Sequence, residues 1–138
     1  MSIELNHVSF CYDSHTADEI AALREVELFI GDGEFVGIMG HTGCGKTTLA
    51  QLVAGLLTPL AGAVKIDGTD INKKGYDRKL LRKKVGFVFQ YPEHQLFETT
   101  VEREVAFGLK NSGLSKGEQK ERVRAALECM GFPFEKIP

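Results

Sequence analysis

Residues 40–48 read Gly40-His41-Thr42-Gly43-Cys44-Gly45-Lys46-Thr47-Thr48 and fit the pattern G-x-x-x-x-G-K-[ST]. An apolar run at 35–39 precedes this stretch, and an amphipathic stretch at 49–56 follows it. A strand, a glycine-rich turn and a helix in this order form the setting in which the pattern binds phosphate groups. The sequence therefore predicts a phosphate-binding loop, and we expect all nine residues to lie around the ligand.

The chemistry of such a loop explains its residue types. Glycines let successive backbone N–H groups turn inward around the phosphates, and the helix that begins here adds its positive dipole end. Lys46 would supply a mobile cation to the β and γ phosphates, and Thr47 a hydroxyl group to Mg²⁺. The alternative is a glycine-rich turn that carries a lysine by chance. The combination of strand, spacing and helix favours a nucleoside triphosphate as ligand.

The composition is that of an ordinary soluble globular chain with room for about one domain. Of its 138 residues, 43% are hydrophobic and 26% are charged. The net charge of -2 argues against a nucleic-acid partner, for which a basic face would be expected. Cys11, Cys44 and Cys129 are widely spaced, which indicates reduced thiols instead of zinc ligands or disulfides. No apolar run approaches the roughly 18 residues of a membrane span.

Hydrophobic periodicity places strands first and helices last. Alternating patterns predict half-buried strands at 3–10, 26–30 and 63–66, with a polar surface loop at 13–19. Nearly unbroken apolar runs at 35–39 and 85–89 predict strands of a parallel sheet that are buried on both faces. A short basic helix is expected over 78–84.

The last third of the chain is predicted to be helical. Thr99 with Glu102, and Ser115 with Glu118, each have the spacing of a capping box at a helix N-terminus. Gly131 is placed to end the second of these helices. The stretch 114–119 resembles the sequence LSGGQ with an inserted residue, but we interpret it as that capping box.

Residues 85–111 read VGFVFQYPEHQLFETTVEREVAFGLKN. With the phosphate loop, this segment resembles the ATP-binding cassette (ABC) ATPases. More narrowly, it is similar to the cytosolic ATPase subunits of energy-coupling factor transporters, which import vitamins and metal ions. The resemblance covers nearly the whole chain but only the first half of the family's domain. It implies an α/β fold of the P-loop NTPase type, with an antiparallel β-subdomain, the phosphate-loop strand and helix, and the start of a helical subdomain.

The resemblance also implies roles for two residues outside the loop. Tyr12 matches the aromatic residue that stacks on the adenine ring of ATP, although it could be a strand-end tyrosine at the surface. Gln90 matches the glutamine that reaches Mg²⁺ and water when nucleotide is bound, although it could simply end an apolar strand. The expected ligands of Mg²⁺ are therefore Thr47 and Gln90, and Gln90 is the candidate catalytic residue.

The same resemblance implies two protein partners and a location. The segment 92–107, from Pro92 to Phe107, would dock a membrane-spanning subunit, although its Leu96 and Phe97 could be core residues of the helical subdomain. A second ATPase subunit, identical or related, would complete the nucleotide sites. We expect the chain to act at the cytoplasmic face of the cell membrane.

Three family motifs are not found in the 138 residues: the signature sequence, the Walker B aspartate with its catalytic glutamate, and the switch histidine. We therefore expect an incomplete ABC domain, with residues 1–90 as the β-subdomain and core and residues 91–138 as the start of the helical subdomain. Hydrolysis of ATP by this chain alone should be negligible. Two alternatives remain: a non-hydrolysing nucleotide-binding fragment that acts with a partner, and a soluble phosphate-loop kinase or GTPase.

Overall fold

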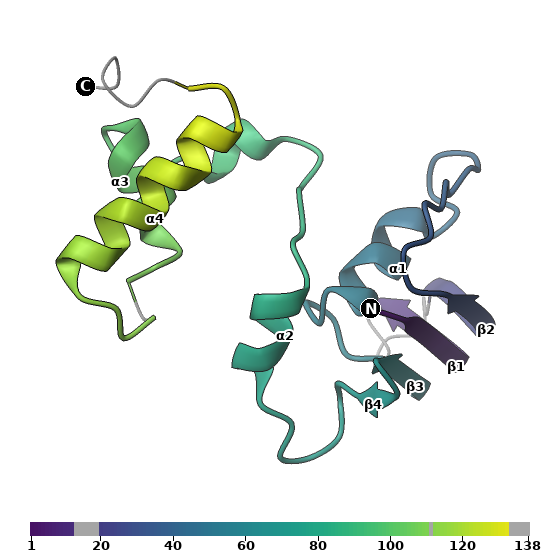
Figure 1. Cartoon of the computed structure of the whole chain (residues 1–138). Helices are drawn as coiled ribbons and strands as arrows, with labels where there is room; N and C mark the ends of the chain where they lie inside the picture. Colours follow the sequence, from purple (N-terminus) through teal and green to yellow (C-terminus); the bar gives the residue numbers. More distant parts are fainter. Residues whose placement is uncertain (13–19, 111, 133–138) are drawn as a thin grey trace. The chain divides into compact units, whose positions relative to one another are not determined.

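A computed structural model describes residues 1–12, 20–110 and 112–132 (Figure 1). The chain divides into two units, Met1–Phe87 and Val88–Pro138, which we describe one at a time. The predicted polar loop at 13–19 lies outside the described residues. The predicted domain division after residue 90 stays a prediction.

The first unit is built on a four-stranded antiparallel sheet in the order β2-β1-β3-β4. Its strands are β1 (Ile3–Tyr12), β2 (Ile20–Ile30), β3 (Ala61–Ile66) and β4 (Thr69–Asp70). β1 is central, since Ile3 pairs with Ile30 on one side and with Ile66 on the other. The antiparallel β-subdomain expected from the sequence is thus present.

The core of this unit lies between the sheet and helix α1 (Lys46–Val53). Leu52 of α1 is fully buried in one cluster with Leu5, Val8 and Val64 of the sheet. Leu49 and Val53 pack against the same cluster, as the amphipathic pattern of this stretch predicts. Burial of this face holds the N-terminus of α1, and hence the phosphate loop, against the sheet.

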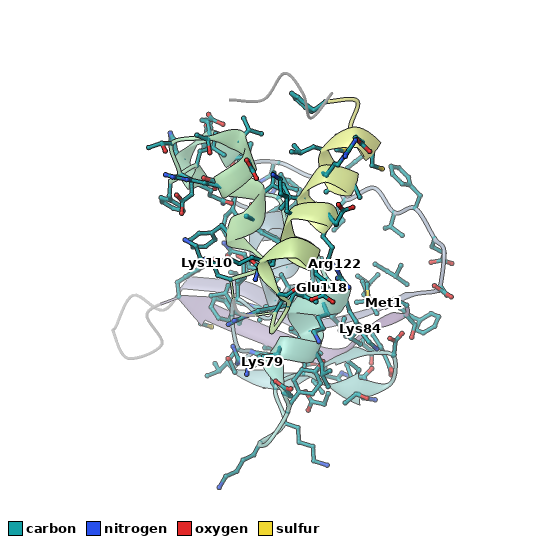
Figure 2. All side chains as sticks on the ribbon, turned by 60° about the vertical axis from the view of Figure 1, so that its left-hand side comes forward. Met1, Lys79, Lys84, Lys110, Glu118 and Arg122 are labelled. Atoms are coloured by element: carbon teal, nitrogen blue, oxygen red, sulfur yellow. The ribbon has the colours of Figure 1, made fainter. Side chains whose placement is uncertain are left out.

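The predicted basic helix is α2 (Arg78–Lys84), and it has the predicted bounds. The side chain of Asp77 caps its N-terminus by accepting a hydrogen bond from the Lys79 N–H. Leu81 is the side chain that α2 buries in the core. Figure 2 labels Lys79 and Lys84 on this helix.

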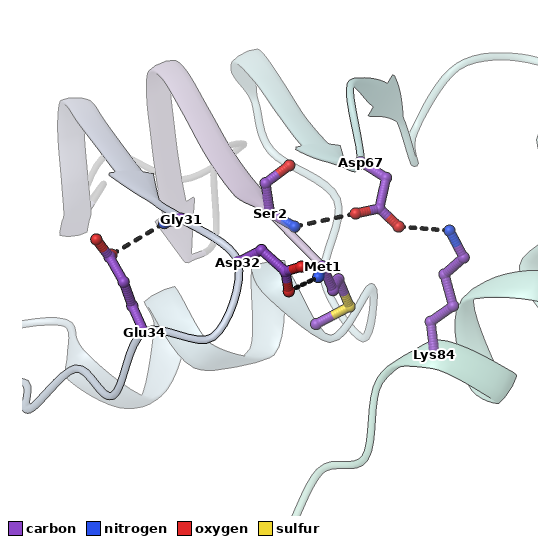
Figure 3. Close-up of polar contacts among 7 residues, drawn as sticks. All are labelled: Met1, Ser2, Gly31, Asp32, Glu34, Asp67 and Lys84. Carbon is purple, nitrogen blue, oxygen red and sulfur yellow. Dashed lines mark hydrogen bonds and ion pairs between the residues drawn. The ribbon is translucent and has the colours of Figure 1, made fainter.

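A polar contact ties α2 to the turn between β3 and β4. This turn, Asp67-Gly68, has positive φ angles of 49° and 74°, as short hairpins require. The Asp67 carboxylate accepts hydrogen bonds from the Ser2 N–H at 2.9 Å and from the Lys84 ammonium at 2.5 Å (Figure 3). The turn therefore links the start of β1 to the end of α2.

Two strand predictions are wrong. Residues 35–39 and 85–89 are not strands, and several of their large side chains face solvent: Phe35 is 101% exposed, Met39 95% and Val88 82%. A strand needs a hydrogen-bonded neighbour, and no strand among residues 1–12, 20–110 and 112–132 pairs with either run. The apolar composition of these runs suits strands, but the pairing that would make a parallel sheet is missing from the described part.

The second unit is helical. It contains a 3₁₀ turn, η1 (Pro92–Gln95), and helices α3 (Val101–Phe107) and α4 (Lys116–Cys129). Val123 and Leu127 are the buried side chains of α4. Figure 1 shows α3 and α4 side by side.

Both ends of α4 agree with the sequence. The capping box is complete, since the Ser115 hydroxyl accepts from the Glu118 N–H and the Glu118 carboxylate accepts from the Ser115 N–H. At the other end, Gly131 has a φ of 77°. The N–H groups of Gly131 and Phe132 bond to the carbonyls of Glu128 and Leu127, which is the Schellman arrangement.

The first predicted capping box, Thr99 with Glu102, is wrong, because the residue three positions after the actual cap is Arg103. Thr100, not Thr99, precedes α3, and its hydroxyl accepts from the Arg103 N–H at 3.3 Å. The glutamate that holds this turn is Glu104, whose carboxylate accepts hydrogen bonds from the N–H groups of Phe97 and Glu98.

Candidate functional site

The phosphate loop is packed against strand β2. Gly45 ends the loop and directly precedes α1, with a φ of 90°. A Cβ atom there would lie 2.6 Å from the Ala22 carbonyl oxygen and 2.9 Å from a Leu23 methyl group. Only glycine tolerates both this φ and this close approach. At the other end of the loop, a Cβ on Gly40 would lie 2.6 Å from the sulfur of Cys44.

Lys46 folds back over the loop. Its ammonium donates hydrogen bonds to the carbonyl oxygens of Gly40 and His41, both at 2.7 Å, and lies 3.6 Å from the sulfur of Cys44. The cation is thereby held at the centre of the loop without a carboxylate partner among these contacts. A triphosphate would offer it oxygens with full negative charge in place of neutral carbonyl oxygens.

The N-terminus of α1 offers free donors to an anion. No side chain caps it, and its first turn carries no acidic residue. The first N–H groups of a helix have no intrahelical acceptor, and the helix dipole adds partial positive charge there. Thr47 is exposed in this first turn, where its hydroxyl can reach a bound ligand. Together with Lys46, these groups are the donors that a phosphate anion would need, and its binding here stays a prediction.

Tyr12 lies next to the loop helix. Its hydroxyl is 2.9 Å from the hydroxyl oxygen of Thr48, which is 4% exposed, and its ring packs edge-on against Phe10 at 5.0 Å between centroids. The ring of Tyr12 is still 43% exposed. The structure thus brings together Tyr12 and the loop, which are far apart in the sequence. Stacking on adenine stays a prediction.

The link between Tyr12 and Thr48 is a contact beside the loop that the sequence did not reveal. The motif assigns a role to Thr47, the first of the two threonines. It assigns no separate role to Thr48, the last residue of the loop. The two threonines differ in the structure. Thr47 is exposed, while Thr48 is buried and its hydroxyl is hydrogen-bonded to that of Tyr12 in β1. In the sequence, only the small polar side chain of Thr48 could have indicated this contact.

The other predicted site residues belong to the second unit. Gln90 is exposed there, two residues before η1 begins, and its role in catalysis and in binding Mg²⁺ stays a prediction. Within the segment 92–107, Leu96 is 66% exposed and Phe97 is 72% exposed. Of the two alternatives for these side chains, the core position is wrong, and an exposed apolar surface is what the structure has.

Two further findings concern metal clusters and membrane-spanning helices in the described residues. Within 1–12, 20–110 and 112–132, no group of three or more histidine, cysteine, aspartate or glutamate side chains could hold a metal ion. In the same part of the chain, every helix is too short or too polar to cross a bilayer.

A comparison with known protein families matches residues 23–137 to the ABC transporter family. The chain belongs to the ABC transporter family. The match spans the phosphate loop, both exposed apolar runs and the helices of the second unit. It makes the soluble kinase and GTPase alternatives wrong.

Individual relatives of this ABC-family chain agree with the family. It is 50% identical over 135 residues to the energy-coupling factor transporter ATP-binding protein EcfA2 of Caldanaerobacter subterraneus subsp. tengcongensis. That alignment covers 98% of this chain and 47% of the relative. The chain therefore spans about half the length of the curated relatives that it matches.

Solved structures confirm the P-loop NTPase fold. The dimeric post-hydrolysis state of the ATP-binding cassette MJ0796, bound to ADP and Pi, has a TM-score of 0.76 and 30% identity. The alignment covers 96% of this chain and 59% of that one. The cbiO1 protein of Clostridium perfringens, part of the ABC transporter complex cbiONQ, has a TM-score of 0.75 and 34% identity. That alignment covers 94% of this chain and 50% of the cbiO1 chain.

Proposed function

We propose that this chain is the ATP-binding part of an energy-coupling factor transporter ATPase. The carrying observation is the loop itself, in which Lys46 and the uncapped N-terminus of α1 converge on one anion site. The EcfA2 relatives, which are ATP-binding proteins by name, support the same ligand. Tyr12, at the edge of this site, would contact the adenine ring through its exposed face.

Mg²⁺ would accompany the nucleotide. The Thr47 hydroxyl is exposed at the first turn of α1 and provides the hard oxygen ligand that Mg²⁺ prefers. Gln90 would add an amide oxygen, a neutral ligand of the same kind. Mg²⁺ held by Thr47 and Gln90 would offset the negative charge of the phosphate groups. We expect hydrolysis by the 138-residue chain alone to stay far below the roughly 1 per second of working enzymes.

The exposed apolar side chains Leu96 and Phe97 support the proposed membrane partner. The backbone of their segment is fixed by Glu104, whose carboxylate accepts hydrogen bonds from the N–H groups of Phe97 and Glu98. A membrane-spanning subunit would bury both side chains on docking. A second ATPase subunit is supported by the dimeric cassette among the structural neighbours. The transported substrate would be a vitamin or a metal ion.

Titration of the purified chain with Mg-ATP tests the nucleotide proposal. We expect Lys46→Ala to abolish binding, because the ammonium is the only full positive charge that the loop carries to the phosphates. We expect Tyr12→Ala to weaken ATP but to change tripolyphosphate binding much less. Lys120→Ala on the exposed face of α4 is the matched control. Unchanged ATP affinity in Lys46→Ala would contradict the proposal.

A further inference from the structure

The segment 73–84 carries a concentration of positive charge that the nucleotide site does not use. It contains a single acidic residue, Asp77, and seven basic residues: Lys73, Lys74, Arg78, Lys79, Arg82, Lys83 and Lys84. The chain as a whole has a net charge of -2. The positive charge is therefore gathered on α2 and the loop before it, against the overall charge of the protein.

The geometry of α2 points part of this charge at solvent. Leu81 is 3% exposed and fixes the inward face of the helix. At about 100° per residue, Lys79 and Lys83 lie on the face opposite Leu81, with Arg82 and Leu80 on either side of them. The three basic side chains are exposed, and Leu80, at the edge of this face, is 52% exposed. The result is a basic helix face with one apolar residue at its edge.

The fold itself gains little from most of these cations. Lys84 pairs with Asp67, and Arg78 donates to the Gly55 carbonyl oxygen at 3.1 Å. Within the described part of the chain, Lys79, Arg82 and Lys83 have no ion pair. Lys79 and Lys83, four residues apart, repel each other along the helix. Lys79 also lies in the first turn, where the helix dipole disfavours a cation.

A hollow of about 480 Å³ adjoins this face in the first unit. Ile66, Tyr76 and Leu80 give it an apolar lining, and its wall carries three lysines and two aspartates: Lys73, Lys74, Lys84, Asp70 and Asp77. The small excess of positive charge around this apolar lining fits a surface of negative charge with hydrocarbon close beneath it.

We propose that this basic face, defined by Lys73, Lys74, Lys79, Arg82 and Lys83, binds anionic lipid headgroups at a membrane surface. Clusters of four to eight basic residues have this affinity, because each contributes about a fivefold gain near an anionic leaflet. Exposed Leu80 adds an apolar side chain that can enter the interface. A single-stranded nucleic acid would call for exposed aromatic rings on which bases stack, and α2 carries none. The proposal does not depend on ATP binding.

Co-sedimentation of the full 138-residue chain with lipid vesicles tests the proposal. The probes are vesicles of phosphatidylglycerol mixed with phosphatidylcholine, and vesicles of phosphatidylcholine alone. We expect binding to the anionic vesicles only, with affinity falling as salt rises from about 0.05 M to about 0.3 M. The triple variant Lys79→Gln, Arg82→Gln, Lys83→Gln should lose about 100-fold in vesicle affinity, at about fivefold per residue.

The control removes the same charge elsewhere. Lys116→Gln, Lys120→Gln, Arg122→Gln on α4 deletes three exposed cations that lie among Glu118 and Glu121, and should leave vesicle affinity within about twofold. Circular dichroism checks that both variants fold. A second variant, Leu80→Ser, keeps the charge and should weaken binding several-fold.

Three results would overturn the proposal. Equal binding to neutral and anionic vesicles would show that charge is not recognised. An equal loss in the α2 and α4 triple variants would show that net charge alone matters. Binding of soluble polyglutamate by α2 without any vesicle binding would assign the face to an acidic protein partner instead.

Discussion

At the residue scale, Lys46 lies on the loop that it is predicted to serve. Its ammonium is held by two neutral carbonyl oxygens at 2.7 Å, and both bonds must be exchanged when phosphate oxygens arrive. Charged acceptors bind an ammonium more strongly than neutral ones, so the exchange favours the ligand. The loop is thus already arranged around a positive charge before any anion binds.

Tyr12 has two separable parts, a ring and a hydroxyl. Tyr12→Phe removes the hydrogen bond to Thr48, whose hydroxyl is buried, and should lower the free energy of unfolding by about 1 kcal/mol. It keeps the exposed ring, so ATP affinity should stay within about twofold if stacking on adenine is the role. Urea unfolding and ATP titration measure the two effects. A large loss of ATP affinity in Tyr12→Phe would assign the role to the hydroxyl.

Cys44 provides a chemical probe of the same site. Its side chain is exposed and its sulfur lies 3.6 Å from the Lys46 ammonium, while Cys129 is exposed at the end of α4. We expect a maleimide to label both thiols, and Mg-ATP to protect Cys44 alone, because bound phosphates would cover the loop. Peptide mapping after limited labelling measures this, with Cys129 as the internal control. Equal labelling of Cys44 with and without Mg-ATP would place the nucleotide elsewhere.

At the scale of elements, the contact between the β3–β4 turn and α2 makes stability depend on pH. The hydrogen bond from Lys84, followed by that from the Ser2 N–H, lowers the pKa of Asp67 below its usual value (Figure 3). A carboxyl group whose pKa is lower in the folded state stabilises the fold above its ordinary pKa of about 4. This contribution is lost as the pH falls through the lowered pKa.

Asp67→Asn should therefore destabilise the protein near neutral pH, and the difference from the parent chain should shrink in acid. Urea unfolding followed by circular dichroism at about pH 7 and about pH 3 measures both. Glu121→Gln, at an exposed position of α4, is the control and should have little effect at either pH. If the loss of stability in Asp67→Asn were larger at about pH 3 than at about pH 7, the prediction would be wrong.

At the scale of the whole molecule, the run 35–39 exposes unusual apolar surface. Phe35 and Met39 are almost fully exposed in an extended segment without a strand partner in the described chain. Such surface favours association between molecules. Phe35→Ser with Met39→Ser should reduce concentration-dependent association, measured by light scattering, and leave the circular dichroism spectrum unchanged.

Leu52→Ser is the matched control for that variant. Leu52 is fully buried between α1 and the sheet, so its loss should cost about 2–5 kcal/mol and unfold a marginal chain. If the Phe35 and Met39 variant unfolds as Leu52→Ser does, these two side chains contribute to a core and are not free surface.

The sequence alone determined the features that depend on neighbouring residues. The phosphate loop, the bounds of α2 and the Ser115 capping box all follow from local backbone chemistry and short hydrogen bonds. Because these interactions span only a few residues, their patterns are visible in the chain itself.

Only the tertiary structure decided the features that need distant partners. The apolar run 35–39 has the composition of a strand but gains no ladder, since its hydrogen bonds would have to come from another segment. Thr48 is buried, and its hydroxyl lies 2.9 Å from that of Tyr12, thirty-six positions away. Contacts of this kind are set by packing, and composition does not reveal which partners will meet.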